Sequence, residues 1–191
     1  MNKTPTETER TIVEAAIKRF LRYGARKTSM NDIADEANVS RQTLYDLFDG
    51  KDDLICASIR SITDKSIADI REKTADLSEL GDQLDVYFTD NIVRSFEMMT
   101  VSDDPQDLVT GHNEAGKAEI ANSRRKHEAL ISEWFEPYAT AIEEFGHSVG
   151  ALAHYFVTVA MALKYEAKDR KDLDALWQCH RTMVLKAAER E

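Results

Sequence analysis

The run from residue 26 to residue 51 constrains the fold of this chain most strongly, because it predicts two short helices joined by a tight turn. In the first of these helices, Ile33, Ala34 and Ala37 are spaced so that small apolar side chains fall on one face. A helix this short needs a partner helix to cover that face. The run therefore predicts a compact helical unit rather than an isolated helix.

The turn between the two predicted helices is the tripeptide Asn38-Val39-Ser40. Asn38 tolerates the left-handed conformation almost as glycine does, and Ser40 can cap the second helix. The second helix, from about residue 41 to 47, buries Leu44. Its first turn and outer face carry groups that suit phosphates and base edges in a DNA major groove: Arg41, Gln42, Thr43 and Tyr45. This arrangement is typical of a DNA-reading helix-turn-helix.

The run also resembles the N-terminal domain of the tetracycline-repressor (TetR) family. The shared motifs, in order within residues 28 to 54, are an Ile-Ala pair, an Ala-x-Val-Ser turn, a Thr-Leu-Tyr-x-x-Phe recognition helix and a Lys-x-x-Leu at the start of the next helix. An ordered set at fixed spacing is far more specific than a single helix-turn-helix pattern. The sequence departs from the family at Asn38, where Gly is common, at Asp49-Gly50, where Pro-Ser or a similar pair is common, and at the acidic Asp46 of the recognition helix.

The resemblance implies DNA contacts at the matching positions, which are Thr28, Ser29, Ser40, Arg41, Gln42, Thr43, Tyr45 and Lys51. The chemistry of these side chains fits the same role. Gln42 and Arg41 are suited to read adenine and guanine, and hydroxyl and ammonium groups at helix starts can bind phosphate. The alternative is a solvated surface whose hydroxyls only cap helices.

The charge distribution is uneven along the chain, whose net charge is -10. Residues 1–51 hold nine Lys and Arg against eight Asp and Glu, a net charge of +1. The remaining residues therefore carry a net charge of -11 and are strongly acidic. This asymmetry fits a DNA-binding head on an acidic body that the duplex repels. A head so close to neutral needs a few well-placed cations, backbone amides and a second copy to bind phosphates.

Almost every segment has helical periodicity, and no alternating β-branched run of strand length is present. We predict an all-α chain with a three-helix helix-turn-helix DNA-binding domain in residues 1–50 and a helical effector-binding and dimerisation domain in residues 51–191. The core of the head is expected around Phe20, Ile33, Ala37, Leu44 and Phe48.

A long helix from about residue 49 to 73, on the order of 35 Å, is predicted to join the two domains. Further helices are expected over residues 81–100, from 114 onward, over 147–168 and over 172–191. Pro137 must break or kink the one that begins near residue 114, because proline lacks an amide hydrogen.

The last two predicted helices carry apolar stripes and small residues that favour close helix packing. They predict a homodimer interface formed by Leu152, Phe156, Val159, Leu163, Leu176, Trp177, Met183 and Val184. The TetR resemblance implies the same arrangement, because that family pairs these two helices into a four-helix bundle. The alternative is that both are core helices of a monomer.

Large, deformable apolar side chains in the middle helices predict a small-molecule pocket. The expected lining residues are Phe88, Ile92, Phe96, Met99, Trp134, Tyr138 and Tyr155. Polar anchors are expected among Asn91, Arg94, His112, Asn113 and His154. The alternative is again a core, for which aromatic and methionine residues at helical spacing are also typical.

The five histidines and two cysteines show no metal-ligand spacing, and no catalytic motif is evident, so we expect neither a metal, a cofactor nor an enzyme. No apolar run approaches a membrane span and the N-terminus has no apolar signal core, so we expect a cytoplasmic chain without a membrane partner.

Taken with these features, the resemblance implies a repressor that binds a palindromic operator in double-stranded DNA as a homodimer and is released by a small-molecule effector. The alternatives are an activator, an effector-independent regulator, or a helical enzyme or scaffold with a vestigial head.

Overall fold

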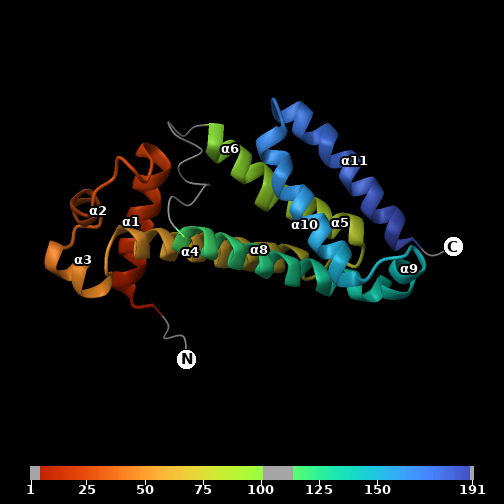
Figure 1. The fold of residues 1–191 in the computed structure, drawn as a ribbon, viewed down its shortest axis with the longest axis horizontal. Coiled ribbons are helices and arrows are strands. Elements are labelled where there is room, and N and C mark those ends of the chain that lie inside the picture. Colours follow the sequence, from red (N-terminus) through yellow and green to blue (C-terminus); the bar gives the residue numbers. More distant parts are fainter. Residues whose placement is uncertain (1–4, 101–113, 190–191) are drawn as a thin grey trace. The chain divides into compact units, whose positions relative to one another are not determined.

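The computed structural model describes residues 5–100 and 114–189, and within these ranges every regular element is a helix (Figure 1). The all-α prediction is therefore confirmed. The elements, in chain order, are α1 (Glu7–Tyr23), α2 (Met30–Glu36), α3 (Arg41–Leu47), α4 (Lys51–Thr74), α5 (Leu80–Tyr87), η1 (Phe88–Val93), α6 (Arg94–Thr100), α8 (Glu114–Phe135), η2 (Glu136–Tyr138), α9 (Ala139–Glu144), α10 (Val149–Glu166) and α11 (Arg170–Ala188).

The chain divides into two compact units. The first unit comprises Met1–Asp64 and Met98–Ser123, and the second comprises Lys65–Glu97 and Arg124–Glu191. The predicted division into functional domains after residue 50 stays a prediction. The compact units divide α4 in its middle instead, because its first half is packed into the first unit, where Leu54 is fully buried.

The core of the first unit holds all five residues predicted for it. Phe20, Ile33, Ala37, Leu44 and Phe48 are buried in one apolar cluster. The cluster is closed by α1, whose apolar stripe packs against α2 and α3. The three-helix head is therefore formed by the hydrophobic pattern that the sequence displays.

The turn between α2 and α3 has the conformation expected from its sequence. Asn38 has a φ of 53° and is the one non-glycine residue with positive φ in the part of the chain that the structure describes. Val39 is partly buried and packs against the head core. The short side chain of Asn38 and the apolar side chain of Val39 thus set the angle at which α3 leaves α2.

The segment predicted as one helix over residues 81–100 is divided into α5, a π-helical η1 and α6. Side-chain hydroxyls explain the irregularity. Thr89 Oγ1 donates to the carbonyl of Asp85 at 3.0 Å, and Ser95 Oγ donates to the carbonyl of Asn91 at 2.5 Å. Such bonds to a carbonyl one turn earlier compete with the backbone ladder. Single π turns of this kind occur often at functional sites.

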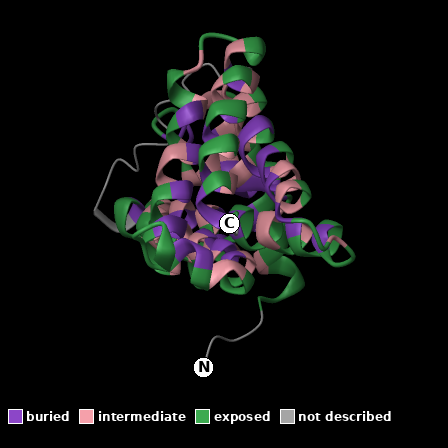
Figure 2. Cartoon of the chain, turned by 90° about the vertical axis from the view of Figure 1, so that its right-hand side faces the viewer, coloured by how far each residue is buried: buried purple, intermediate pink, exposed green. Residues whose placement is uncertain are grey.

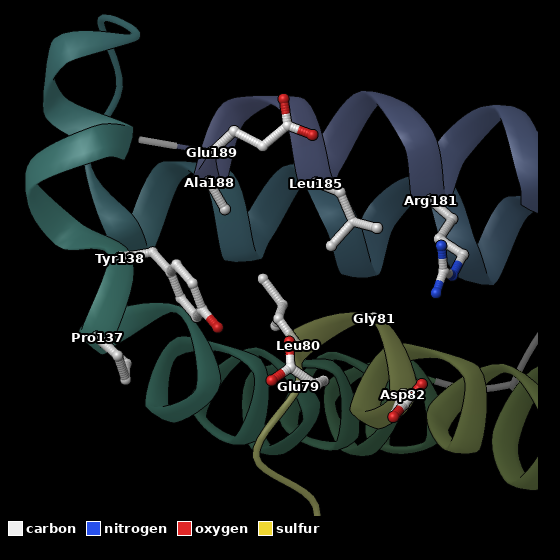
Figure 3. Close-up of a pocket in the computed structure, with 10 residues that line it drawn as sticks. All are labelled: Glu79, Leu80, Gly81, Asp82, Pro137, Tyr138, Arg181, Leu185, Ala188 and Glu189. Atoms are coloured by element: carbon white, nitrogen blue, oxygen red, sulfur yellow. The ribbon is translucent and has the colours of Figure 1, made fainter. Parts of the chain in front are cut away.

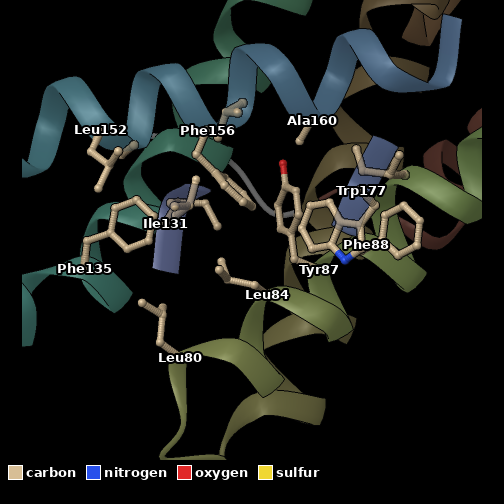
Figure 4. Packing of buried hydrophobic residues seen from close by; sticks show 14 of the residues in the cluster. Leu80, Leu84, Tyr87, Phe88, Ile131, Phe135, Leu152, Phe156, Ala160 and Trp177 are labelled. Atoms are coloured by element: carbon tan, nitrogen blue, oxygen red, sulfur yellow. The ribbon is translucent and has the colours of Figure 1, made fainter. Parts of the chain in front are cut away.

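The predicted break at Pro137 is confirmed, because α8 ends at Phe135 and a short 3-10 turn, η2, carries the proline. The core of the second unit is larger and more aromatic than that of the first. It includes Tyr87, Phe135, Phe156 and Trp177, all with at most 1% of their surface exposed (Figure 4). Along the helices, buried and exposed residues alternate (Figure 2).

No single helix among the described residues is long and apolar enough to cross a membrane. One bent pair, Gly116–Glu144 with Val149–Glu166, meets the criteria of length and composition only, with an angle of 109° between its parts.

Candidate nucleic-acid interface

Two serine caps fix the helices of the helix-turn-helix. Ser29 caps α2: its Oγ accepts a hydrogen bond from the Asp32 amide at 3.2 Å, and the Asp32 carboxylate accepts from the Ser29 amide at 2.8 Å. The Ser29 hydroxyl also lowers the pKa of Asp32. Ser40 caps α3 in the same way, accepting from the Thr43 amide at 3.0 Å. These capping bonds satisfy amides that a helix start leaves without partners.

The outer face of α3 is polar and exposed, as predicted. Arg41 and Gln42 are exposed, 53% of the surface of Tyr45 is exposed, and Leu44 on the opposite face is fully buried. Thr43 is partly buried beside its cap. The face therefore offers a guanidinium, an amide and a phenol, which are the groups that bind bases and phosphates in a major groove.

The acidic residue of α3, Asp46, is paired with Gln42. Gln42 Nε2 donates to Asp46 Oδ1 at 2.7 Å, one helical turn away on the exposed face. The bond leaves Gln42 Oε1 and a second N–H available, which is the pair needed to bind adenine. The departure from the family pattern at Asp46 thus positions the side chain predicted to read a base.

Two of the predicted DNA-contacting residues are used within the first unit. The Thr28 side chain is buried and its hydroxyl donates to the carbonyl of Gly24 at 2.8 Å. Lys51 Nζ donates to the carbonyls of Ala25 and Thr28 at 3.0 and 3.3 Å. The predicted use of the Thr28 hydroxyl as a phosphate donor is therefore corrected, because the end of α1 leaves carbonyls that this hydroxyl satisfies. Lys51 holds the same loop and is only partly available.

The residues predicted to line a ligand pocket do not form a single site. Phe88 and Ile92 lie in the core of the second unit, where Phe88 stacks on Trp177 with ring centroids 4.6 Å apart. Phe96 and Trp134 are partly buried against this core. Met99 belongs to the first unit. Helical spacing places these residues on the apolar faces of their own helices. In the folded protein these faces lie in different environments and do not surround one cavity.

Tyr138 lies in a separate open groove of about 720 Å³ in the second unit, lined also by Leu80, Arg181 and Glu189 (Figure 3). Arg181 is not free there, because its Nε donates to Asp85 Oδ1 at 2.8 Å. Tyr155 is exposed on the surface of α10, so it does not have the enclosed surroundings of a pocket residue.

The predicted polar anchors have different surroundings from one another. Asn91 is buried in η1. Arg94 forms an ion pair with Asp69 at 3.6 Å, and His154 Nδ1 lies 2.8 Å from Glu128 Oε1. His112 and Asn113 lie outside the described residues.

The predicted dimer interface needs correction at five of its eight residues. They are buried in the core of one protomer: Leu152, Phe156, Leu163, Trp177 and Val184. Val159 and Leu176 are partly buried, and Met183 is 62% exposed. The apolar residues predicted from the sequence come from two faces of α10 and of α11. Only the outer face of each helix is available to a partner.

Sequence reasoning missed a group of buried polar side chains in the second unit. Tyr87 and His127 are at most 2% exposed, and Tyr87 Oη and His127 Nδ1 have no hydrogen-bond partner among the described residues. Both stand at apolar positions of their helices, so periodicity counts them as core. Their lack of partners is visible only when α5 and α8 are packed together. Within the described ranges, no three His, Cys, Asp or Glu side chains are grouped to hold a metal ion.

Residues 12–57 match the family model described as bacterial regulatory proteins, tetR family. Among curated proteins, the chain is similar to the probable acrEF/envCD operon repressor of Escherichia coli K12, with 44% identity over 48 residues. That match covers 25% of this chain and 22% of the repressor. The chain thus spans less than a quarter of the length of this relative.

The fold matches solved structures over nearly the whole chain. A transcriptional regulator of Rhodococcus sp. RHA1 aligns with a TM-score of 0.72 at 14% identity, covering 95% of this chain and 97% of that one. The regulatory protein TetR of Rhodobacter sphaeroides aligns with a TM-score of 0.69 at 15% identity, covering 93% and 98%. The fatty acid degradation regulator FadR of Bacillus halodurans aligns with a TM-score of 0.67 at 16% identity, covering 96% and 97%. At these identities the likeness concerns the fold.

Proposed function

We propose that this chain represses transcription by binding a palindromic operator as a homodimer, and that a small-molecule effector releases it; the proposal is supported by the match of residues 12–57 to the model of the tetR family of bacterial regulatory proteins. The observation that carries the proposal is the α3 face. Arg41, Gln42 and Tyr45 project from a capped recognition helix whose other face is buried.

Repression of this kind needs two recognition helices spaced by about one turn of DNA, roughly 34 Å, or by a multiple of it. An effector that binds better to a different spacing shifts the population away from the DNA-bound state. The continuous helix α4, from Lys51 to Thr74, contributes residues to both compact units. It is the element through which we expect a change in the second unit to reach the head.

The dimer interface of this proposal differs from the one predicted by sequence. It uses the outer face of α10 and α11, whose apolar or sulfur-containing residues are Tyr155, Val159, Leu176, Cys179 and Met183. On α11, Leu176, Cys179 and Met183 follow the spacing of one helix face. Exposed large apolar side chains grouped on one face are typical of a protein-protein interface.

The test is fluorescence anisotropy with DNA sites obtained by in vitro selection with the full-length protein. We expect Arg41→Ala and Tyr45→Ala each to weaken binding by roughly 1–3 kcal/mol. Binding should fall steeply as salt rises, and a sequence-specific signal should survive competitor DNA. Lys171→Ala and Tyr165→Phe, both in exposed positions of the second unit, serve as controls and should bind like the unaltered protein.

Unchanged affinity of folded Arg41→Ala and Tyr45→Ala variants would contradict the assignment of α3. Binding that is insensitive to salt and lost to competitor DNA would favour a helical enzyme or scaffold with a vestigial head. A reporter gene behind the selected site separates repression from activation.

A further inference from the structure

A set of polar and charged side chains that form no hydrogen bond or ion pair with the described residues lies in the second unit, at the junction of its aromatic core and its surface. We call it the donor cluster. It comprises Tyr87, Asn91, Arg124, His127 and Lys164. These residues come from α5, η1, α8 and α10, so the fold alone brings them into one unit.

The buried members of the donor cluster lack partners. Tyr87 Oη, Asn91 Nδ2 and His127 Nδ1 are each shielded from solvent and form no hydrogen bond with the described residues. The Asn91 amide approaches the Tyr87 hydroxyl without reaching hydrogen-bond geometry. Leaving one buried polar group unsatisfied costs about 1–3 kcal/mol. Thr158 Oγ1 and His180 Nδ1 are also buried without partners among the described residues, but the donor cluster differs from them in including two cations, Arg124 and Lys164.

The protonation states make these groups donors. Burial raises the pKa of Tyr87, so the phenol keeps its proton and can donate. Burial, and then the charge of Lys164, lower the pKa of His127 to about 4, so its ring is neutral at pH 7. A neutral imidazole carries one N–H. An acceptor oxygen therefore suits Tyr87 Oη, Asn91 Nδ2 and, in the tautomer protonated at Nδ1, His127.

The charge of the cluster is positive and uncompensated. Lys164 and Arg124 are partly buried and close enough for Arg124 to act on Lys164 electrostatically, and neither forms an ion pair with a carboxylate of the described residues. Burial, and then the charge of Arg124, lower the pKa of Lys164 to about 8. The acid that acts on Tyr87, Glu128, is already paired with His154 at 2.8 Å. A ligand anion would relieve the repulsion between the two cations.

The surroundings of the buried donors are apolar and aromatic. The Tyr87 ring lies 5.4 Å from Phe156 and 6.5 Å from Trp134 between ring centroids. Figure 4 shows the Tyr87 hydroxyl directed toward α10, between Phe156 and Ala160. Lys164 follows Ala160 by one turn of the same helix. A ligand here would place its charged end near Lys164 and an apolar body beside these rings.

We propose that the donor cluster binds the carboxylate of a small organic acid with an apolar body. This inference rests on the proposed function, because it identifies the chemical class of the effector. Lys164 and Arg124 are only partly buried, so the charged end of the site is reachable from solvent. The aromatic side chains beneath it form the wall for the apolar body.

The experiment uses the full-length protein with benzoate, hexanoate and decanoate, each beside its neutral amide of the same shape. Binding is followed by calorimetry and by the combined fluorescence of Trp134 and Trp177. At least one acid should bind about tenfold or more tightly than its amide, because a charge-assisted hydrogen bond is lost in the amide. Equal binding of each acid and its amide, or no binding of any of the three acids, overturns the proposal.

Three variants test the residues. Lys164→Met should weaken binding of the acid by about tenfold or more, whereas Lys168→Met, an exposed lysine just beyond α10, should leave it unchanged. Tyr87→Phe should weaken binding and raise or preserve the melting temperature of the free protein, because the hydroxyl it removes has no partner. A lower melting temperature for the free Tyr87→Phe protein, or unaltered acid binding by Lys164→Met, contradicts the assignment.

Anisotropy with selected DNA separates this proposal from the proposed function. An acid that binds and lowers DNA affinity supports both. Acid binding by a protein that binds no DNA supports the donor cluster and overturns the regulator. DNA binding by a protein that binds none of the acids overturns the donor cluster and leaves the regulator intact.

Discussion

The two compact units use their polar side chains in opposite ways. In the first unit, the hydroxyls and cations around the helix-turn-helix are bonded to the backbone: Thr28 to Gly24, Ser40 to Thr43, and Lys51 to two loop carbonyls. Arg19 Nε and Ser58 Oγ are the exceptions among the described residues of this unit. In the second unit, the core itself contains polar atoms without partners among the described residues, such as Tyr87 Oη, His127 Nδ1 and His180 Nδ1.

This difference separates a unit whose polar groups hold its helices in place from a unit whose polar groups are left to bind something else. Satisfied caps fix α2 and α3 in one geometry, which reading a base sequence requires. Unsatisfied donors lower the stability of a core, and we propose that those of the second unit are retained because a ligand supplies the missing bonds. The head therefore has the satisfied polar groups expected of a rigid unit that reads a base sequence. The second unit has the unsatisfied polar groups expected of a unit that responds to a ligand.

The largest expected effects come from truncating one core residue in each unit. Phe156→Ala should lower the free energy of unfolding by about 3–5 kcal/mol and Leu44→Ala by about 2–5 kcal/mol, because both side chains are fully buried. Trp134 and Trp177 both lie in the second unit, so in urea titrations their fluorescence reports that unit.

Leu44→Ala should abolish DNA binding with little change in the tryptophan transition, whereas Phe156→Ala should shift that transition. If Leu44→Ala moves the tryptophan transition as far as Phe156→Ala does, the two units unfold together. Their stabilities then cannot be treated as separate.

Acid should destabilise the second unit selectively. Burial lowers the pKa of His127 and His180 to about 4, against 6.5 for an ordinary histidine. The unfolded chain then binds more protons between these values. The stabilisation is present in full above pH 6.5 and is lost as the pH falls toward 4, by at most about 3 kcal/mol for each histidine.

The first 64 residues contain no histidine, so the head should be unaffected between pH 6.5 and 5. The measurement is the urea midpoint of tryptophan fluorescence against pH. His180→Gln should flatten the profile, and the exposed His147→Gln should not. A profile that is already flat between pH 6.5 and 5 would count against neutral, buried imidazoles.

The smallest expected effects compare one bonded and one unbonded hydroxyl. Ser29→Ala removes the cap of α2 and should cost about 1 kcal/mol. Thr158→Val removes a hydroxyl whose oxygen is buried without a partner among the described residues, so it should be neutral or stabilising. Thermal unfolding of both variants gives the comparison. A Thr158→Val protein as destabilised as Ser29→Ala would show that hydroxyls in the two units are equally well satisfied.

The sequence by itself determined the helical class, the three-helix head and the breaks at Asn38 and Pro137. These features depend on residues close together in the chain. Ser29 and Asp32 form a cap within one turn, and the apolar face of α3 is complete within seven residues. Local spacing and backbone preference carry such information directly.

Only the tertiary structure decided which side chains are available. Periodicity marks the apolar faces of α10 and α11 but does not say which one turns inward, so Phe156 and Trp177 were predicted at an interface and lie in the core. Thr28 is a local case: its hydroxyl bonds to the carbonyl of Gly24, only four residues earlier in the chain, which the apolar periodicity does not indicate. Tyr87, His127 and Lys164 come from three helices, so only the packed structure shows that they lack hydrogen-bond and ion-pair partners among the described residues.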